Sequence, residues 1–327
     1  MTSASMLARA RALWRSRVGR VGRILVLVGL AAYLLHTVDI AGALDRAGRA
    51  NLLIVVVAII VLTSVHLVAA LNWRTIVARL GGVPLTRRSA IRAYYASQAL
   101  GGITTGNLGG DAYRVVAVRS AGGDWAGAAL GVLVQRATSF AALGLLGVVA
   151  LAALPNVLDI AGPLIASAGG LAVVLTIPGL LVLRRRRGVT GTAGRPALAA
   201  ATLIGLAGGA AFHVIAIAAS YALVLAVDPR ASGTAILAAV ALARLSLAVP
   251  IAPSGIGVQE SVLAALFVLL GASPETAVAA SLLGRLALLT TTAIGLALVA
   301  RRPTWTTGAT APLPAAGRDG AEATIVR

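Results

Sequence analysis

The chain has 327 residues, of which 59% are hydrophobic and only 12% are charged, about half the charged share of a typical water-soluble protein. Most of its surface must therefore face hydrocarbon, which excludes an ordinary water-soluble enzyme. The net charge of +18 comes from arginine alone, and the arginines lie between apolar runs rather than with aromatic residues on one basic face, which argues against a nucleic-acid partner.

Six apolar stretches have about the length that a helix needs to cross a bilayer, roughly 20 residues. In chain order they cover residues 21–36, 51–72, 126–154, 158–183, 196–227 and 275–300. Two further apolar segments, 91–118 and 233–270, are interrupted by glycine, proline and polar residues. The sequence therefore predicts an all-α, polytopic transmembrane helix bundle over residues 21–302. A basic cytoplasmic tail (1–20) and a disordered tail rich in Thr, Ala, Pro and Gly (303–327) are expected to flank it.

Arginine placement predicts the orientation of these spans, because arginine-rich loops stay on the cytoplasmic side. The arginine-rich segments are the N-terminal tail, residues 74–92, Arg184–Arg187 and the pair Arg301 and Arg302. We therefore expect a plasma-membrane protein with both termini in the cytoplasm. Segment 91–118 must then start and end inside, and its length is too short for two crossings. A re-entrant helical hairpin is predicted, with its turn around residues 104–107.

The segment 233–270 behaves as the mirror image, because it starts and ends on the outer side. It is broken at Pro250–Gly255, and its arms fit either a second re-entrant hairpin or two short spans. One hairpin entering from each side resembles the inverted repeats of secondary transporters, in which broken helices meet near the midplane and form the substrate site.

Charged side chains within these apolar segments indicate a binding site. Six lie in or beside them: Asp111, Arg114, Arg136, Arg244, Glu260 and Arg285. Each unpaired charge at the bilayer centre costs about 2.5–3.5 kcal/mol on insertion scales, so these groups must pair with one another or line a wet cavity. Four arginines against two carboxylates leave two positive charges, and the guanidinium fork fits phosphate. The alternative is that Glu260 only joins two helices through one arginine while the others reach the membrane interface.

The break in the second hairpin has features that suit an anion. Ser254 is a plausible N-cap for a helix starting at Gly255, and a helix N-terminus favours negative charge. Gly255 and Gly257 would let a headgroup approach the backbone closely. His66 and His213 are interpreted instead as polar residues that join neighbouring helices.

Signatures of catalysis are missing from the sequence. It contains no Gly-x-x-x-x-Gly-Lys-Ser/Thr loop, no His-Glu-x-x-His motif and no Asp-rich cluster. Cysteine is absent and the three histidines are scattered. No catalytic residue, metal ligand or cofactor is therefore predicted.

Four sequence elements together resemble one membrane family. They are Asn107–Arg114 (NLGGDAYR), Val134–Arg136 (VQR), Pro250–Glu260 (PIAPSGIGVQE) and Leu283–Leu286 (LGRL). Over roughly residues 21–302 the chain resembles the transmembrane domain of lysylphosphatidylglycerol synthase, a flippase-like family. It departs from the family pattern at three positions. Asp111 and Gln135 stand where the family usually has glutamate, and Ser139 where an aspartate often follows.

The resemblance implies a bundle that binds or flips a membrane lipid, here an anionic lipid or a lipid-linked headgroup. In multidomain relatives this module accompanies a soluble domain that transfers an amino acid from aminoacyl-tRNA to phosphatidylglycerol. The sequence shows no such domain, so we do not expect aminoacyl transfer by this chain alone. Two alternatives stay open: a membrane subunit of a lipid-modifying enzyme whose catalytic domain is on another chain, and a scaffold whose buried charges only specify helix pairing.

Overall fold

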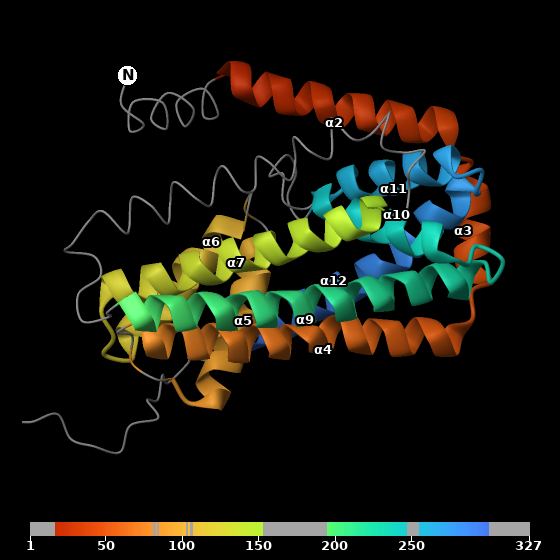
Figure 1. Ribbon diagram of the computed structural model, residues 1–327. Helices are drawn as coiled ribbons and strands as arrows, with labels where there is room; N and C mark the ends of the chain where they lie inside the picture. The colour runs from red at the N-terminus through yellow and green to blue at the C-terminus, as the bar shows by residue number, and fades with distance from the viewer. Residues whose placement is uncertain are drawn as a thin grey trace, which may run out of the picture.

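A computed structural model describes residues 17–80, 83, 85–102, 104, 107–152, 195–246 and 255–300 of the chain (Figure 1). All the regular elements among these residues are α-helices. They are α2 (Arg17–Thr37), α3 (Ile40–Gly48), α4 (Leu52–Arg79), α5 (Arg87–Gly102), α6 (Leu108–Ser120), α7 (Trp125–Ala152), α9 (Arg195–Val227), α10 (Thr234–Leu245), α11 (Val258–Leu269) and α12 (Pro274–Ala300). The expected span 158–183, Arg184–Arg187, Ser254 and most of both tails lie outside the described residues.

Four of the described helices, α4, α7, α9 and α12, are long and apolar enough to cross a membrane. A fifth crossing is formed only if α2 and α3, which meet at a bend of 74°, count as one broken span. Most of residues 39–49, which separate the expected spans 21–36 and 51–72, is therefore helical and forms α3. The helix α3 packs against α12, and its residue Ala43 is fully buried there.

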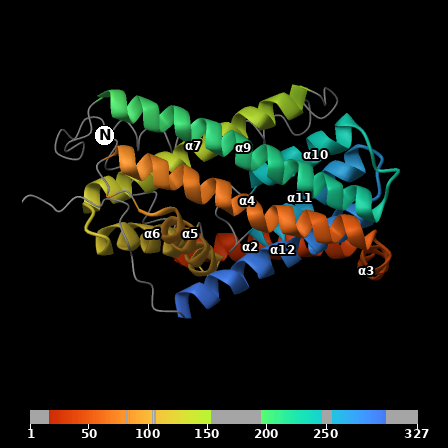
Figure 2. The ribbon, with the colours of Figure 1, turned by 90° about the horizontal axis from the view of Figure 1, so that it is seen from below.

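The long helices α4 and α9 lie side by side along the bundle in both views (Figures 1 and 2). On another face of α9, Gly205 and Gly209 lie one turn apart and oppose Thr138 and Ser139 of α7. A Cβ atom at Gly209 would lie only 2.9 Å from the Cα atom of Ser139. Small residues at this spacing allow two apolar helices to pack with their backbones close together.

Each of the two interrupted apolar segments forms a pair of short helices. In the first pair, α5 ends at Gly102 and α6 begins at Leu108. The side chain of Thr104 accepts a hydrogen bond from the Gly109 N–H at 2.9 Å, and Asn107 has a left-handed backbone with φ of 60°. The second pair is α10 and α11, which pack on each other. The two pairs lie toward opposite ends of the long helices (Figures 1 and 2).

The helix that follows each short pair packs on the other half of the molecule. α7 follows the first pair and packs on α9 and α10, whereas α12 follows the second pair and packs on α4 and α5. Each half, α4–α7 and α9–α12, thus consists of a long helix, a short pair and a second long helix that crosses to its counterpart. This exchange brings side chains from both halves around one central space.

The helix α11 begins later than the sequence suggested. We expected a start at Gly255, but the α-helix begins at Val258 with Gly257 as its N-cap residue. The backbone explains the difference, since Gly255 and Gly257 have φ angles of 64° and 80°, which a right-handed helix does not use.

Candidate functional site

A cavity of about 350 Å³ lies between the two halves of the bundle. Residues of α4, α5, α7, α9, α10, α11 and α12 line it. Its charged lining consists of Arg136, Arg244 and Arg285, and no carboxylate lines it within the described part of the chain. We call it the large cavity, and each of its three arginines has a different environment.

Arg136 belongs to a cluster around Asp111 at the start of α6. One oxygen of Asp111 accepts a hydrogen bond from Arg114 Nη2 at 2.5 Å, and the other pairs with Arg136 Nη1. Arg114 also donates to Gln135 Oε1, and Gln135 Nε2 donates to the Ala69 carbonyl at 2.7 Å. One carboxylate thus serves two arginines, and the cluster keeps one positive charge.

Arg285 of α12 is neutralised by Glu260. Its Nη2 atom lies 2.6 Å from Glu260 Oε1, and it also donates to the Gly255 carbonyl at 3.2 Å. The second oxygen of Glu260 accepts the Gly257 N–H at 2.9 Å. We expected a ligand to bring a negative charge to the N-terminus of α11, but Glu260 supplies that charge from within the chain.

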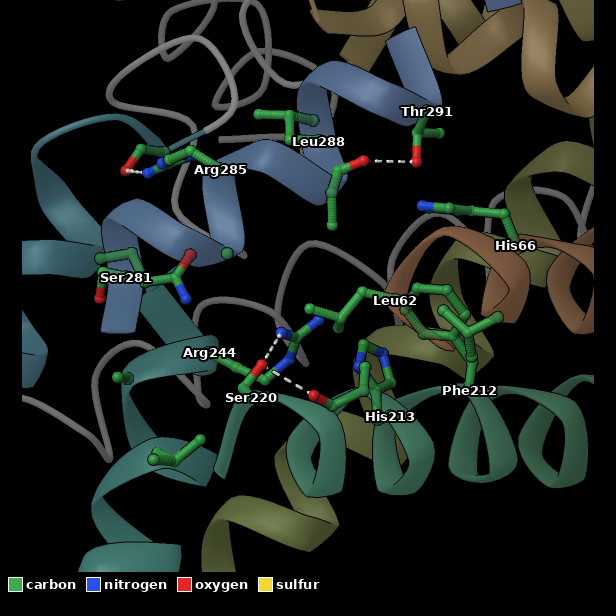
Figure 3. A pocket seen from close by; sticks show the side chains of 18 of the residues that line it. Leu62, His66, Phe212, His213, Ser220, Arg244, Ser281, Arg285, Leu288 and Thr291 are labelled. Atoms are coloured by element: carbon green, nitrogen blue, oxygen red, sulfur yellow. Dashed lines mark hydrogen bonds between the residues drawn. The ribbon is translucent and has the colours of Figure 1, made fainter. Parts of the chain in front are cut away.

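Arg244, near the end of α10, has no carboxylate partner among the described residues. It donates from Nη1 to the hydroxyl of Ser220 on α9 at 3.1 Å, and its Nε is buried without a hydrogen-bond partner. The sequence between the described ends of α10 and α11, residues 247–254, contains no acidic residue. Figure 3 shows Arg244, Ser220 and His213 grouped together, with Arg285 on a separate wall. Within the described part of the chain, Arg244 therefore brings a second uncompensated positive charge to the large cavity.

Two histidines also line the large cavity. His213 Nε2 lies 3.0 Å from the Ser139 hydroxyl, so this residue does join α9 to α7. The Nδ1 atoms of both His66 and His213 are buried without a hydrogen-bond partner in the described structure. Our sequence interpretation made both residues purely structural and missed their place in the cavity. The sequence did contain a signal for this place in the cavity, because each histidine is a polar residue within a long apolar run.

A smaller cavity of about 220 Å³ adjoins the large one. Asn107, Arg136, Phe140 and Phe212 line both. The smaller cavity is otherwise lined mainly by polar and small residues: Ala69, Asn72, Tyr94, Arg114, Gln135, Ser139, Gly205, Gly208 and Gly209. We call it the small cavity. Sequence reasoning did not find it, because Asn72 and the glycines of α9 come together only through helix packing.

The predicted site residues that the structure describes line one of the two cavities, form ion pairs with the cavity arginines, or cap a helix. Arg136, Arg244, Arg285 and Gly255 line the large cavity, and Arg114 lines the small cavity together with Arg136. Asp111 and Glu260 hold these arginines as ion-pair partners, and Gly257 caps α11. No group of three potential metal-ligating residues occurs in the described ranges.

Comparison with known proteins gives one match. Residues 20–295 match the family model described as the lysylphosphatidylglycerol synthase TM region. The chain matches no curated protein and no solved structure.

Proposed function

The chain belongs to the lysylphosphatidylglycerol synthase TM region family, and from this premise we propose that it binds and flips an anionic lipid or lipid-linked headgroup. The family and the four candidate spans make it a multi-pass membrane protein. We further propose that it lies in the plasma membrane with both termini in the cytoplasm, because its arginine-rich segments alternate with weakly charged loops.

The observation that carries this proposal is the charge of the large cavity. Arg285 is neutralised by Glu260, but Arg244 has no carboxylate partner in the described chain, and the Asp111 cluster keeps one further positive charge. An uncompensated arginine within a bilayer costs about 2.5–3.5 kcal/mol, and a bound phosphate offsets that cost. The planar guanidinium group also gives phosphate two parallel hydrogen bonds.

A correspondence between the two halves supports movement of the headgroup. Asp111 lies 25 residues before Arg136, and Glu260 lies 25 residues before Arg285. Each acid is in the first turns of the second short helix, and each arginine is the twelfth residue of the long helix that follows. We infer an inverted repeat whose re-entrant hairpins, α5–α6 and α10–α11, act as opposing gates on one cavity.

Lipid mass spectrometry on protein extracted gently from its native membrane tests the binding proposal. The informative variant is R244Q, which removes the charge without a carboxylate partner. A matched control is R46Q, because Arg46 is also partly buried and donates to a hydroxyl, that of Thr276, at 3.2 Å outside the cavity. We expect an anionic lipid to be enriched on the wild type and on R46Q but not on R244Q.

Translocation is tested separately with a fluorescent anionic lipid in vesicles that contain the protein. We expect the labelled lipid to reach the opposite leaflet faster with wild type or R46Q than with R244Q. If wild type and R244Q carry the same bulk lipid mixture, the cavity does not select an anionic headgroup and the proposal fails. Enrichment without any movement would restrict the function to lipid binding.

A further inference from the structure

We propose that the small cavity is a second subsite, which receives the uncharged, hydroxyl-bearing end of a polyol-phosphate headgroup while the phosphate lies at Arg244. This inference rests on the proposed function and specifies the ligand that the two cavities select together. It also predicts which headgroups are rejected, namely those that end in an ammonium group.

Two buried polar atoms of the small-cavity residues lack partners. Asn72 donates from Nδ2 to the Ile204 carbonyl at 2.7 Å, and this bond leaves Oδ1 as a buried acceptor with no donor. Arg114 is only 3% exposed, and its Nε has no acceptor. A buried polar group without a partner is costly, so both atoms favour a ligand that completes their bonds. One of them needs a donor and the other an acceptor, and a hydroxyl group provides both.

The other polar side chains leave little room for a different ligand. Gln135 is already bonded at both amide atoms, to Arg114 and to Ala69. Ser139 is paired with His213. The guanidinium of Arg114 stacks on the ring of Tyr94 with its carbon 5.1 Å from the ring centroid, which fixes the direction of its Nε. The buried hydrogen-bonding atoms that remain without a partner are therefore those of Asn72 and Arg114, and the Tyr94 hydroxyl and the Asn107 side chain also line the cavity.

The charge of the small cavity excludes a cationic group. Arg114 and Arg136 line it, and no carboxylate does so within the described residues. Asp111 neutralises only one of these two arginines. An ammonium group would meet a net positive charge in a site of low dielectric constant, so an amine-bearing or aminoacylated headgroup is disfavoured there. A neutral polyol is not affected by this repulsion.

The two cavities are close enough to be filled by one headgroup. Asn107, Arg136, Phe140 and Phe212 belong to the walls of both. A phosphate at Arg244 can therefore be followed by a substituent that passes these residues and enters the small cavity. Phosphatidic acid has no such substituent, phosphatidylinositol has an uncharged one, and phosphatidylethanolamine has a cationic one.

These three lipids with identical acyl chains, offered in equal amounts in vesicles that contain the full chain, provide the test. Native mass spectrometry of the recovered protein measures which lipid stays bound. We expect phosphatidylinositol to exceed phosphatidic acid by about fivefold to tenfold, the value of one or two net hydrogen bonds. Phosphatidylethanolamine should not be enriched at all.

The variant N72A removes the unpaired acceptor but leaves Arg114, so it should lower the excess of phosphatidylinositol over phosphatidic acid, with phosphatidic acid binding unchanged. T75A is the matched control, since Thr75 lies on the same helix and bonds only to the Leu71 carbonyl of that helix. If N72A does not fold, Y94F decides, because it removes one hydroxyl from the small cavity and keeps the ring beneath Arg114. We expect Y94F to lower the same ratio.

A wild-type protein that binds phosphatidic acid through Arg244 but shows no preference for phosphatidylinositol would overturn the subsite while leaving the proposed function intact. Equal enrichment of phosphatidylethanolamine, or a ratio unchanged in the folded variants, would overturn it as well. If no anionic lipid exceeds its share of the vesicle mixture, the proposed function fails and the subsite fails with it.

Discussion

Glu260 binds Arg285 with one carboxylate oxygen and caps its own helix with the other. Oε1 accepts a hydrogen bond from Arg285 Nε at 2.7 Å, and Oε2 accepts one from the Gly257 N–H at 2.9 Å. The same residue therefore neutralises a cavity arginine and fixes the start of α11. Arg285 is therefore neutralised within the chain, whereas no described carboxylate neutralises Arg244. We accordingly expect changes at the Glu260–Arg285 pair to affect stability, and changes at Arg244 to affect ligand binding.

Replacing Glu260 should therefore destabilise the bundle. E260Q keeps an oxygen for the Gly257 N–H but leaves Arg285 without its counter-charge, which we expect to cost about 2–3 kcal/mol, somewhat less than for a fully buried pair. Chemical or thermal unfolding in detergent measures the loss. E275Q is the control, because Glu275 also lies in the first turn of a helix and accepts a hydrogen bond there, from the Ser273 hydroxyl, but interacts with Arg46 only at longer range than an ion pair.

Exchanging the two charges should not restore stability. The double variant E260R, R285E keeps an ion pair but loses the acceptor for the Gly257 N–H, so we expect it to be less stable than E260Q. If the exchanged protein unfolds like the wild type, the pair acts only as a link between helices and its capping role is wrong.

Because Asp111 pairs with both Arg114 and Arg136, we expect D111N to be less stable than R136Q. D111N leaves Arg114 and Arg136 close together without a counter-charge, whereas R136Q leaves Asp111 paired with Arg114. We expect D111N to lose about 3 kcal/mol or more and R136Q about 1 kcal/mol, since removal of a buried counter-charge costs more than removal of one of two cations. Unfolding of both variants under the same conditions gives the order, and equal losses would contradict it.

The close packing of α9 on α7 should not accept a larger side chain. G209V places a β-branched group against the backbone of Ser139, and overpacking of this kind costs about 1–3 kcal/mol, or more where the backbone must move. G144V is the matched control, because a Cβ atom at Gly144 of α7 meets nothing within 4 Å. We expect monodisperse folded protein for G144V and a reduced folded fraction for G209V in size-exclusion chromatography.

Adding a carboxylate beside Arg114 should weaken anion binding. Q135E brings the charge of the Asp111 cluster from one positive charge to zero and keeps the oxygen that Arg114 binds. We expect the enrichment of an anionic lipid on the folded protein to fall severalfold by mass spectrometry, although the variant also loses the hydrogen bond that Gln135 Nε2 donates to the Ala69 carbonyl. Q98E, on α5 at the wall of the large cavity, shows how far a carboxylate outside the cluster has the same effect. If Q135E binds as well as the wild type, the cluster does not contribute to the site.

The sequence predicts the parts of this fold that depend on local composition. Runs of apolar residues predicted α4, α7, α9 and α12, and glycines within such runs predicted the breaks between α5 and α6 and between α10 and α11. Partners across the bundle depend on how each helix is rotated, which no local pattern records. The sequence therefore identified Arg136 and Arg285 as buried cations but not the carboxylate that each binds, and it missed Asn72 and His66 as cavity residues.

The order of charges along the chain has a consequence for membrane insertion. Asp111 is synthesised 25 residues before Arg136, and Glu260 25 residues before Arg285. As the polypeptide leaves the ribosome, each short acidic helix is available before the long helix whose arginine it neutralises. When α7 and α12 enter the membrane, Asp111 and Glu260 have therefore already been synthesised and can neutralise Arg136 and Arg285. Arg244 emerges with no such preceding acid on its own hairpin, so we expect it to stay without a counter-ion until it meets an anion from outside that hairpin.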